Sequence, residues 1–173
     1  MGATALFREG AGSMARHLAA SNIGVVYGGG SVGLMGVVAD AALGAGGEVF
    51  GVIPDPRVSG EVAHPGLSHL DIVPDMHARK TRMAELSDAF IALPGGVGTL
   101  EELFEAWTWQ QLGIHRKPVA LYDIDGYWQP LLRALDDMTS HGFISEFTRS
   151  TLIVRDDPEE LLAALRAWTP PAR

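Results

Sequence analysis

Six short apolar runs alternate with longer amphipathic segments, and this alternation constrains the fold more than any other feature of the chain. Each run is apolar on both of its alternating faces, which is typical of strands in a parallel sheet that helices cover on each side. The pattern predicts an α/β domain with a doubly wound parallel sheet, whose ligands bind where strands end and helices begin. We expect strands at Ile23–Tyr27, Val49–Ile53, Leu70–Val73, Ala89–Leu93, Val119–Tyr122 and Leu152–Val154, and helices at Gly12–Ala20, Leu34–Leu43, His77–Leu86, Leu100–Leu112, Tyr127–Ser140 and Pro158–Trp168.

The length of the chain predicts one domain. Its 173 residues, 47% of them hydrophobic, suffice for an ordinary core. We expect a single domain over residues 1–168 and a flexible tail at residues 169–173. The Pro- and Gly-rich stretch Pro54–Ser68 predicts an irregular loop, which either covers a site as a mobile loop or is a variable surface excursion. A doubly wound sheet normally opens with a strand, yet Met1–Ser13 contains no convincing apolar run. The opening strand is therefore missing: either the fold does without it or this chain lacks a short preceding segment, and we expect the second.

The charge and composition exclude several classes of function. A formal net charge of −8 and a pI near 5.1 give no general attraction to nucleic acid or to anionic membranes. The absence of cysteine excludes disulfides, thiolate metal sites and thiol catalysis. No apolar run approaches the roughly 20 residues of a membrane span, and no signal-peptide pattern opens the chain. We therefore expect a cytoplasmic protein with neither a membrane nor a nucleic acid as partner.

The first of two glycine turns is "VVYGGGSVGLMG", residues Val25–Gly36, in which an expected strand runs through three glycines into an expected helix. Glycines allow a ligand to approach the backbone closely, and a helix start presents free N–H groups, so the turn suits a phosphate. It lacks a strict G-x-G-x-x-G frame with an acidic residue at the ribose distance, which argues against a nicotinamide site. Gly29 and Gly30 are the candidate ligand contacts. The alternative is a tight turn whose glycines serve packing alone.

The second glycine turn, Pro94–Thr99, repeats this logic with a stronger signature. Gly95, Gly96 and Gly98 can expose consecutive amides, and the hydroxyl of Thr99 can bind the same anion. No Gly-Lys-Ser/Thr follows, so the turn is not a triphosphate-binding loop of the Walker type. A monophosphate fits it better.

Glu102 follows this turn within "GTLEE" and has two interpretations. In the first, Thr99 and Glu102 form a capping box, with Thr99 at the N-cap and Glu102 three residues later. In the second, Glu102 lies off the apolar stripe of its helix and faces a cleft, where the helix dipole favours its ionised form. A carboxylate there can act as a base or stabilise a cation. The stripe consists of Leu100, Leu103, Phe104 and Trp107.

Three cations, Arg79, Lys80 and Arg82, lie near the start of the helix expected at His77–Leu86. Cations at a helix N-terminus oppose the helix dipole, which indicates an external anion. The alternative is solvated surface charge, especially for Lys80 and Arg82. His77 is either a proton donor or, as is commoner for such a residue, a capping or packing histidine. The remaining histidines show no metal-ligand spacing, so we expect no metal site; they include His64, His69, His115 and His141.

Taken together, these segments resemble the LONELY GUY (LOG) family of cytokinin riboside 5′-monophosphate phosphoribohydrolases, whose members have long been mislabelled as lysine decarboxylases. The resemblance runs through nearly the whole chain, and "PGGVGTLEE" together with "MHARK" is its diagnostic part. The other matching segments, in family order, are "VVYGGGSVGLMG", "GGEVFGVIP", "KPVALYDIDGYWQPLL" and "GFIS".

The resemblance implies a Rossmann-like fold, a homodimer or larger homo-oligomer, and hydrolysis of the N-glycosidic bond of an N6-modified adenosine 5′-monophosphate. The products are the free base and ribose 5-phosphate, and neither a metal nor an organic cofactor is needed. By motif, Arg79 takes the place of the catalytic arginine and Glu102 that of the catalytic glutamate. The positions that match substrate contacts are Gly29, Gly30, Met76, Lys80, Gly95, Gly96, Gly98 and Thr99.

This sequence departs from the family pattern at two places. Ala78 stands where members commonly carry Glu, and the opening strand with its Gly-Ser turn, which bounds the nucleotide pocket in the family, is absent. The chemistry agrees with the resemblance, because a carboxylate such as Glu102 can stabilise the positive charge that develops on ribose as the glycosidic bond breaks. Nothing indicates a pyridoxal phosphate lysine. The alternative function is a non-catalytic nucleotide or molybdenum-cofactor carrier.

Overall fold

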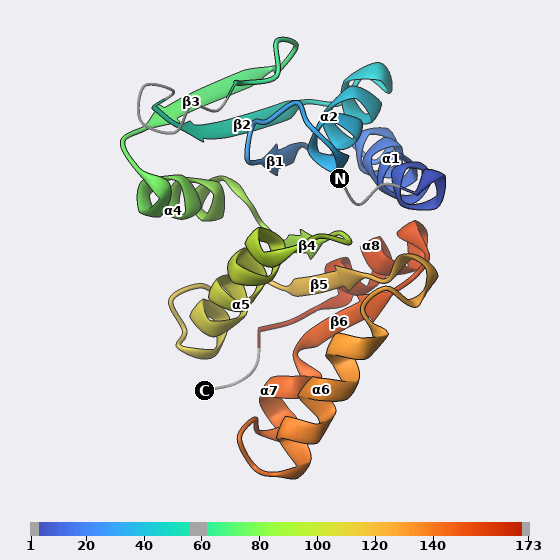
Figure 1. Ribbon diagram of the computed structural model, residues 1–173, viewed down its shortest axis with the longest axis vertical. Helices are drawn as coiled ribbons and strands as arrows, with labels where there is room; N and C mark the ends of the chain where they lie inside the picture. Colours follow the sequence, from blue (N-terminus) through green and yellow to red (C-terminus); the bar gives the residue numbers. More distant parts are fainter. Residues whose placement is uncertain (1–3, 56–61, 171–173) are drawn as a thin grey trace. The chain divides into compact units, whose positions relative to one another are not determined.

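The computed structural model describes residues 4–55 and 62–170, and it contains two parallel sheets of three strands each (Figure 1). The chain divides into two compact units, Met1–Ser87 and Asp88–Arg173, and each unit holds one of the sheets. Every strand lies within two residues of its expected bounds, and helices separate most of them. The prediction of a parallel α/β fold is therefore confirmed, whereas a single domain over residues 1–168 stays a prediction.

The first unit has its strands in the order β1-β2-β3, all parallel. Residues buried between α1, α2 and the strands form its core, in which Ala15 and Ala39 of the two helices meet Val25 and Val49 of the strands. The helix α4 contacts all three strands and follows directly after the carboxyl end of β3. The elements are α1 (Ala5–Ala20), β1 (Val25–Tyr27), α2 (Leu34–Gly44), β2 (Val49–Pro54), β3 (His69–Val73) and α4 (Met76–Leu86).

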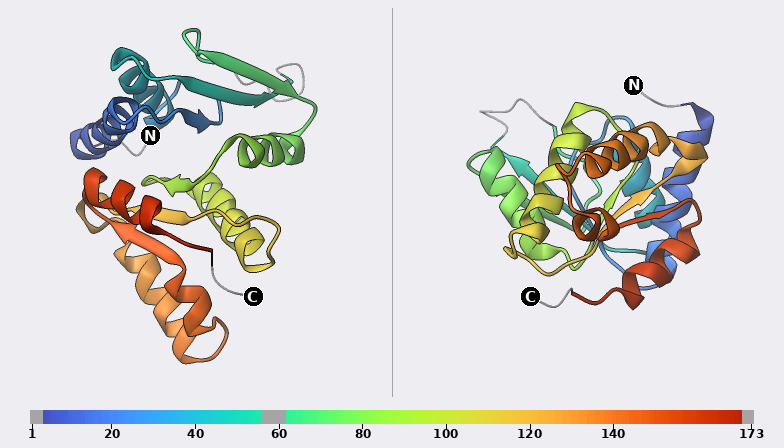
Figure 2. Two further views of the ribbon diagram at one scale, coloured as in Figure 1. Left: turned by 180° about the vertical axis from the view of Figure 1, so that it is seen from behind. Right: turned by 90° about the horizontal axis from the view of Figure 1, so that it is seen from below.

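The second unit has the parallel strand order β4-β5-β6 and carries helices on both faces of its sheet. Val119 and Leu121 of β5 join a core cluster with residues of α5 and α6. Side chains alternate along a strand, so Ala120 and Tyr122 point to the opposite face, where α8 contacts β5 and β6 (Figure 2). The elements are β4 (Phe90–Ala92), α5 (Val97–Gln111), β5 (Val119–Tyr122), a 3₁₀ turn η1 (Ile124–Gly126), α6 (Gln129–Ser140), α7 (Glu146–Ser150), β6 (Leu152–Arg155) and α8 (Pro158–Ala167).

The first helix is longer than expected. It begins at Ala5, seven residues before the expected start at Gly12, and residues 4–24 contain no strand. Its buried face consists mainly of small residues such as Ala11, Ala15 and Ala19, which give a weak hydropathy signal. Gly12 lies against Val37 and Ala41 of α2, so the small residues allow the two helices to pack closely. The short helix α7 was also not expected.

Two expected segments fall partly outside the described residues. Of the loop predicted at Pro54–Ser68, residues 56–61 lie outside them, as do residues 171–173 of the predicted tail. The described end of the loop is tied to the first glycine turn, because the amide of His64 donates to the carbonyl of Gly29 at 2.8 Å and Ala63 pairs with Gly30 in an antiparallel bridge. None of the described helices combines the length and hydropathy that a bilayer crossing requires.

Candidate active site

Arg79 is buried at the carboxyl end of the first sheet, with a relative exposure of 7%. Asp75 caps the amino end of α4 by accepting from the amide of Ala78 at 2.8 Å, which places Arg79 one turn into the helix. Its Nε donates to the carbonyl of Val52 at 3.1 Å and its Nη2 to the carbonyl of Gly28 at 3.1 Å. The surface-charge interpretation of Arg79 is therefore wrong.

The hydrogen-bond partners of Arg79 are electrically neutral. Besides the two carbonyls, Nη1 lies 3.6 Å from the sulfur of Met76. Among residues 4–55 and 62–170, no carboxylate pairs with this guanidinium. A guanidinium carries five N–H donors, so further donors remain for a ligand. A buried cation without a counter-charge favours binding of an anion beside it.

The two cations that follow Arg79 differ in their surroundings. Lys80 is half-buried and has an interaction partner, so it is not a free surface charge. Arg82 forms ion pairs with Asp71 at 2.7 Å and Glu85 at 3.2 Å, and its side chain is 42% exposed. These hydrogen bonds raise the pKa of Arg82. The surface-charge interpretation thus holds for Arg82.

The first glycine turn packs directly against Arg79. A Cβ at Gly28 would overlap the guanidinium, and Gly29 has a φ of +76° and no room for a Cβ beside Ile53. Both glycines are therefore required by the protein's own packing. This finding agrees with the packing interpretation at Gly28 and Gly29, and it does not test whether the turn also contacts a ligand.

The carbonyls of the first glycine turn are held by donors from three different places. Gly28 accepts from Arg79, Gly29 from the amide of His64, and Gly30 from the hydroxyl of Tyr27 at 3.0 Å. Burial, and then the nearby Asp40 carboxylate, raises the pKa of Tyr27 to about 12, so its hydroxyl keeps the proton that it donates. The sequence alone gave no reason to single out Tyr27, although it ends the strand that leads into the turn.

The second glycine turn lies at the carboxyl end of β4 and has its own tyrosine. The hydroxyl of Tyr127, from the connection after β5, donates to the carbonyl of Gly95 at 2.7 Å. A Cβ at Gly95 would overlap the side chain of Thr99, so these two predicted site residues are in contact. Tyr127 was not predicted; its signal is its position just after the carboxyl end of an apolar strand, where ligand-binding residues collect in this fold class.

Gly96 and Gly98 are not required by the packing of the chain. A Cβ at either position would meet no described atom within 4 Å, and neither residue has a positive φ. Both are exposed. Glycine is also used where a ligand must come close to the backbone. Since neither packing nor a positive φ requires glycine at Gly96 and Gly98, close approach of a ligand is the reason that remains.

The capping-box interpretation of Thr99 and Glu102 is wrong. The helix α5 begins at Val97, with Gly96 as its N-cap, and among the described residues no side chain caps it. The extended backbone of Gly96 places its carbonyl to accept from the amide of Leu100 at 3.0 Å, so the helix is capped three residues earlier than the box requires. Glu102 therefore lies in the second turn of α5, half-buried and with a partner, where the helix dipole acts less strongly than expected.

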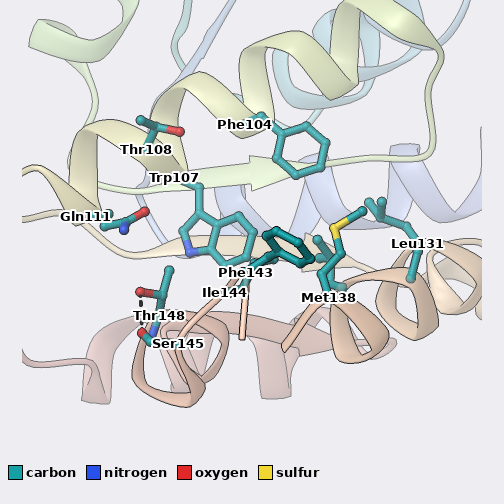
Figure 3. Close-up of a pocket in the computed structure, with 12 residues that line it drawn as sticks. Phe104, Trp107, Thr108, Gln111, Leu131, Met138, Phe143, Ile144, Ser145 and Thr148 are labelled. Atoms are coloured by element: carbon teal, nitrogen blue, oxygen red, sulfur yellow. Dashed lines mark hydrogen bonds between the residues drawn. The ribbon is translucent and has the colours of Figure 1, made fainter. Parts of the chain in front are cut away.

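An apolar pocket of about 450 Å³ also lies in the second unit, between α5, α6 and α7. Figure 3 shows Phe104 and Trp107 of α5 facing Met138, Phe143 and Ile144. Its described lining includes none of the predicted site residues and no cation, so it does not suit a phosphate. Within the part of the chain that the structure describes, no group of three His, Asp or Glu residues is arranged to hold a metal ion.

Comparison with known proteins identifies the family. A family model described as possible lysine decarboxylase matches residues 35–165. The cytokinin riboside 5′-monophosphate phosphoribohydrolase of Rhodococcoides fascians is 52% identical over 155 residues, which cover 89% of this chain and 78% of that protein. The chain belongs to the LONELY GUY family. A LONELY GUY relative in Arabidopsis thaliana, also named a cytokinin riboside 5′-monophosphate phosphoribohydrolase, is 46% identical over 164 residues, covering 95% of this chain and 76% of its own length.

Solved structures with the same fold include proteins outside the LONELY GUY enzymes. The molybdenum cofactor binding protein of Rippkaea orientalis has a TM-score of 0.72 at 22% identity, with 96% of this chain and 90% of that chain covered. The molybdenum cofactor carrier protein of Chlamydomonas reinhardtii has a TM-score of 0.71 at 22% identity, with coverages of 94% and 88%. At this identity the likeness shows the fold alone. It agrees with the Rossmann-like α/β architecture expected for a LONELY GUY member.

Proposed function

We propose that this protein hydrolyses the N-glycosidic bond of adenosine 5′-monophosphates, preferentially N6-modified ones, and releases the base and ribose 5-phosphate. The observation that carries the proposal is the 52% identity to a named phosphoribohydrolase over 89% of the chain. The description of the family model as a possible lysine decarboxylase has no chemical support in the sequence, which offers no recognisable pyridoxal phosphate site.

We propose Arg79 and Glu102 as the catalytic residues. The C1′–N9 bond breaks with its electron pair leaving on the base, water adds its oxygen to C1′, and its proton reaches the departing base. The carboxylate of Glu102 stabilises the cationic sugar and orients the water. Arg79 supplies positive charge to the anionic nucleotide, a role supported by its burial among neutral partners.

The remaining predicted residues hold the substrate in this proposal. The amides of Gly95, Gly96 and Gly98, with the hydroxyl of Thr99, bind the 5′-phosphate. The open space at Gly96 and Gly98 supports this role. The other contacts are supplied by Gly29, Gly30, Met76 and Lys80. Binding energy from the phosphate keeps the ribose in reactive geometry.

The assay separates hydrolysis from carriage. AMP and isopentenyladenosine monophosphate are each incubated with the protein, and the free base is measured by chromatography. Glu102→Gln should lower kcat by roughly 10²-fold or more while the affinity for the nucleotide stays within about threefold. The matched control is Glu101→Gln, which changes the adjacent, exposed glutamate of the same helix. Folded wild-type protein that binds nucleotide without releasing base would identify a carrier instead.

We also propose that the protein is a homodimer or larger homo-oligomer located in the cytoplasm. The family resemblance supports the assembly, and the cysteine-free, acidic composition is compatible with the location. Light scattering coupled to size exclusion measures the mass in solution directly. A particle of 18.4 kDa, the mass of one chain, would contradict the oligomer.

A further inference from the structure

A histidine outside the family motifs holds the first glycine turn in place. The backbone amide of His64 donates to the carbonyl of Gly29 at 2.8 Å, and the neighbouring Ala63 forms an antiparallel bridge with Gly30. The segment that carries these contacts, Val62–Gly66, precedes β3 and has no helix or strand of its own. Its position therefore depends on these backbone contacts and on what its side chains bind.

The ring of His64 anchors this segment to α2. Its Nε2 lies 3.0 Å from Oδ1 of Asp40, and its Nδ1 accepts from the amide of Gly66 at 3.1 Å. Because an amide can only donate, Nδ1 is unprotonated and Nε2 carries the proton that it shares with Asp40. The side chain of His64 is 11% exposed, whereas that of Asp40 is 75% exposed. Both ring nitrogens are thus in use, and the ring has one orientation.

The geometry of the peptide bond connects this anchor to the amides of Gly29 and Gly30, which are proposed above to bind the substrate. In a trans peptide the C=O of one residue and the N–H of the next point in opposite directions within one plane. The hydrogen bond from His64 to the Gly29 carbonyl therefore directs the N–H of Gly30 away from the segment. Arg79 acts in the same way on the preceding peptide, through the Gly28 carbonyl and the Gly29 N–H.

We propose that His64, oriented by Asp40, is a positioning residue that fixes the Gly29–Gly30 peptide so that the Gly30 amide can donate to the nucleotide. This inference rests on the proposed function, because the nucleotide is the ligand. His64 itself touches no substrate. Its loss should weaken substrate binding and leave the chemical step nearly unchanged.

The test compares His64→Ala with His69→Ala. His69 is the matched control because it also faces a carboxylate, Glu48, at 3.9 Å. Its ring stacks on Phe50 of β2, away from the first glycine turn. For His64→Ala we expect KM for isopentenyladenosine monophosphate to rise roughly 3- to 10-fold, the effect of one lost hydrogen bond, with kcat within about twofold. His64→Gln, whose Nε2 can replace the donor to Asp40, should recover part of the loss. Amide hydrogen exchange in residues 28–31 should accelerate in His64→Ala only.

Each outcome decides the inference. Unchanged KM and unchanged exchange in an active His64→Ala protein would overturn it, as would an equal KM rise in His69→Ala. If His64→Ala does not fold, Asp40→Ala tests the same anchor from its exposed side, with the same expected split between KM and kcat. A wild-type protein that releases no base defeats the proposed function, and the exchange measurement, which needs no substrate, then shows whether His64 still fixes the turn.

Discussion

The guanidinium of Arg79 lies against the backbone of Gly28, to whose carbonyl its Nη2 donates at 3.1 Å. The two residues are 51 positions apart in the sequence, and no Cβ fits between them. A conspicuous glycine turn and a buried cation are thus parts of one structure. The proposed catalytic arginine is oriented by the turn as much as by its own helix.

Gly28→Ala should displace Arg79 and reduce hydrolysis. The added methyl group takes the place of the guanidinium, and overpacking a buried site costs roughly 1–3 kcal/mol of unfolding free energy. We expect kcat/KM to fall by about 10²-fold, as for a misplaced catalytic group. Steady-state assays and thermal melts measure the two effects.

The control for this substitution is Gly44→Ala, at the last residue of α2, where a Cβ meets no described atom within 4 Å. It should retain activity and gain up to about 1 kcal/mol of stability through a less flexible unfolded chain. Equal activity in the two alanine variants would contradict the role given to Gly28.

Arg79→Lys should be nearly as damaging as a neutral substitution. The planar guanidinium spans the carbonyls of Val52 and Gly28 with separate nitrogens, whereas an ammonium is a single point of charge and cannot reach both in the same way. We expect a decrease in kcat/KM of roughly 10²-fold for isopentenyladenosine monophosphate. Arg82→Lys, at the ion-paired surface arginine of the same helix, serves as the control and should change activity less than about twofold. Activity retained by Arg79→Lys would show that charge alone suffices.

Much of the fold could be predicted from local pattern, because buried parallel strands appear as continuous apolar runs. β5 was predicted at its observed bounds, Val119–Tyr122. The start of α1 was missed because its buried face consists mainly of alanines and one glycine, whose packing value depends on α2 and not on hydropathy. Local pattern predicts such an element only where large side chains are buried.

The candidate site was predictable in its residues and not in its contacts. Motifs singled out Arg79 and the glycines, but the carbonyl partners of Arg79 come from β2 and the β1 turn, which are distant in sequence. The capping-box interpretation of Thr99 failed because "T-x-x-E" is a local signature. The helix begins before this signature, with Gly96 as its N-cap. Tyr27, Tyr127 and His64 act through hydrogen bonds to backbone carbonyls of the glycine turns, and no motif in the sequence predicts these bonds.

Gly98→Ala and Gly95→Ala should separate ligand binding from folding in the second glycine turn. A methyl group at Gly98 meets only open space, so the protein should fold normally while KM rises by about tenfold or more, because the methyl group obstructs the phosphate. A methyl group at Gly95 overlaps Thr99, so that variant should also lose roughly 1–3 kcal/mol of stability. Thermal melts measure the stability of both variants, and steady-state assays measure their KM. An unchanged KM in a folded Gly98→Ala protein would contradict the proposal that this turn binds the phosphate.

His115 should make stability depend on pH. It lies beneath the carboxyl end of α5, where its Nε2 donates to the carbonyl of Ala106 at 2.8 Å and its Nδ1 accepts from the amide of Lys117 at 3.2 Å. Burial lowers the pKa of His115 below its ordinary 6.5, the hydrogen bond to Ala106 opposes this, and the Lys117 charge reinforces it. The neutral ring is therefore the form that the folded protein accommodates.

The sign of the effect follows from proton uptake. Well above pH 6.5 the ring is neutral in both states, and the histidine adds no pH dependence. As the pH falls below 6.5 the unfolded chain binds a proton first, so the free energy of unfolding decreases until the lower folded pKa is reached. His115→Gln keeps an Nε2 donor for Ala106 and cannot titrate. Urea denaturation at pH 7.5 and pH 5.5 should therefore show a smaller loss of stability in His115→Gln than in the wild type, and equal losses would show that the ring accepts a proton in the folded protein as readily as in the unfolded chain.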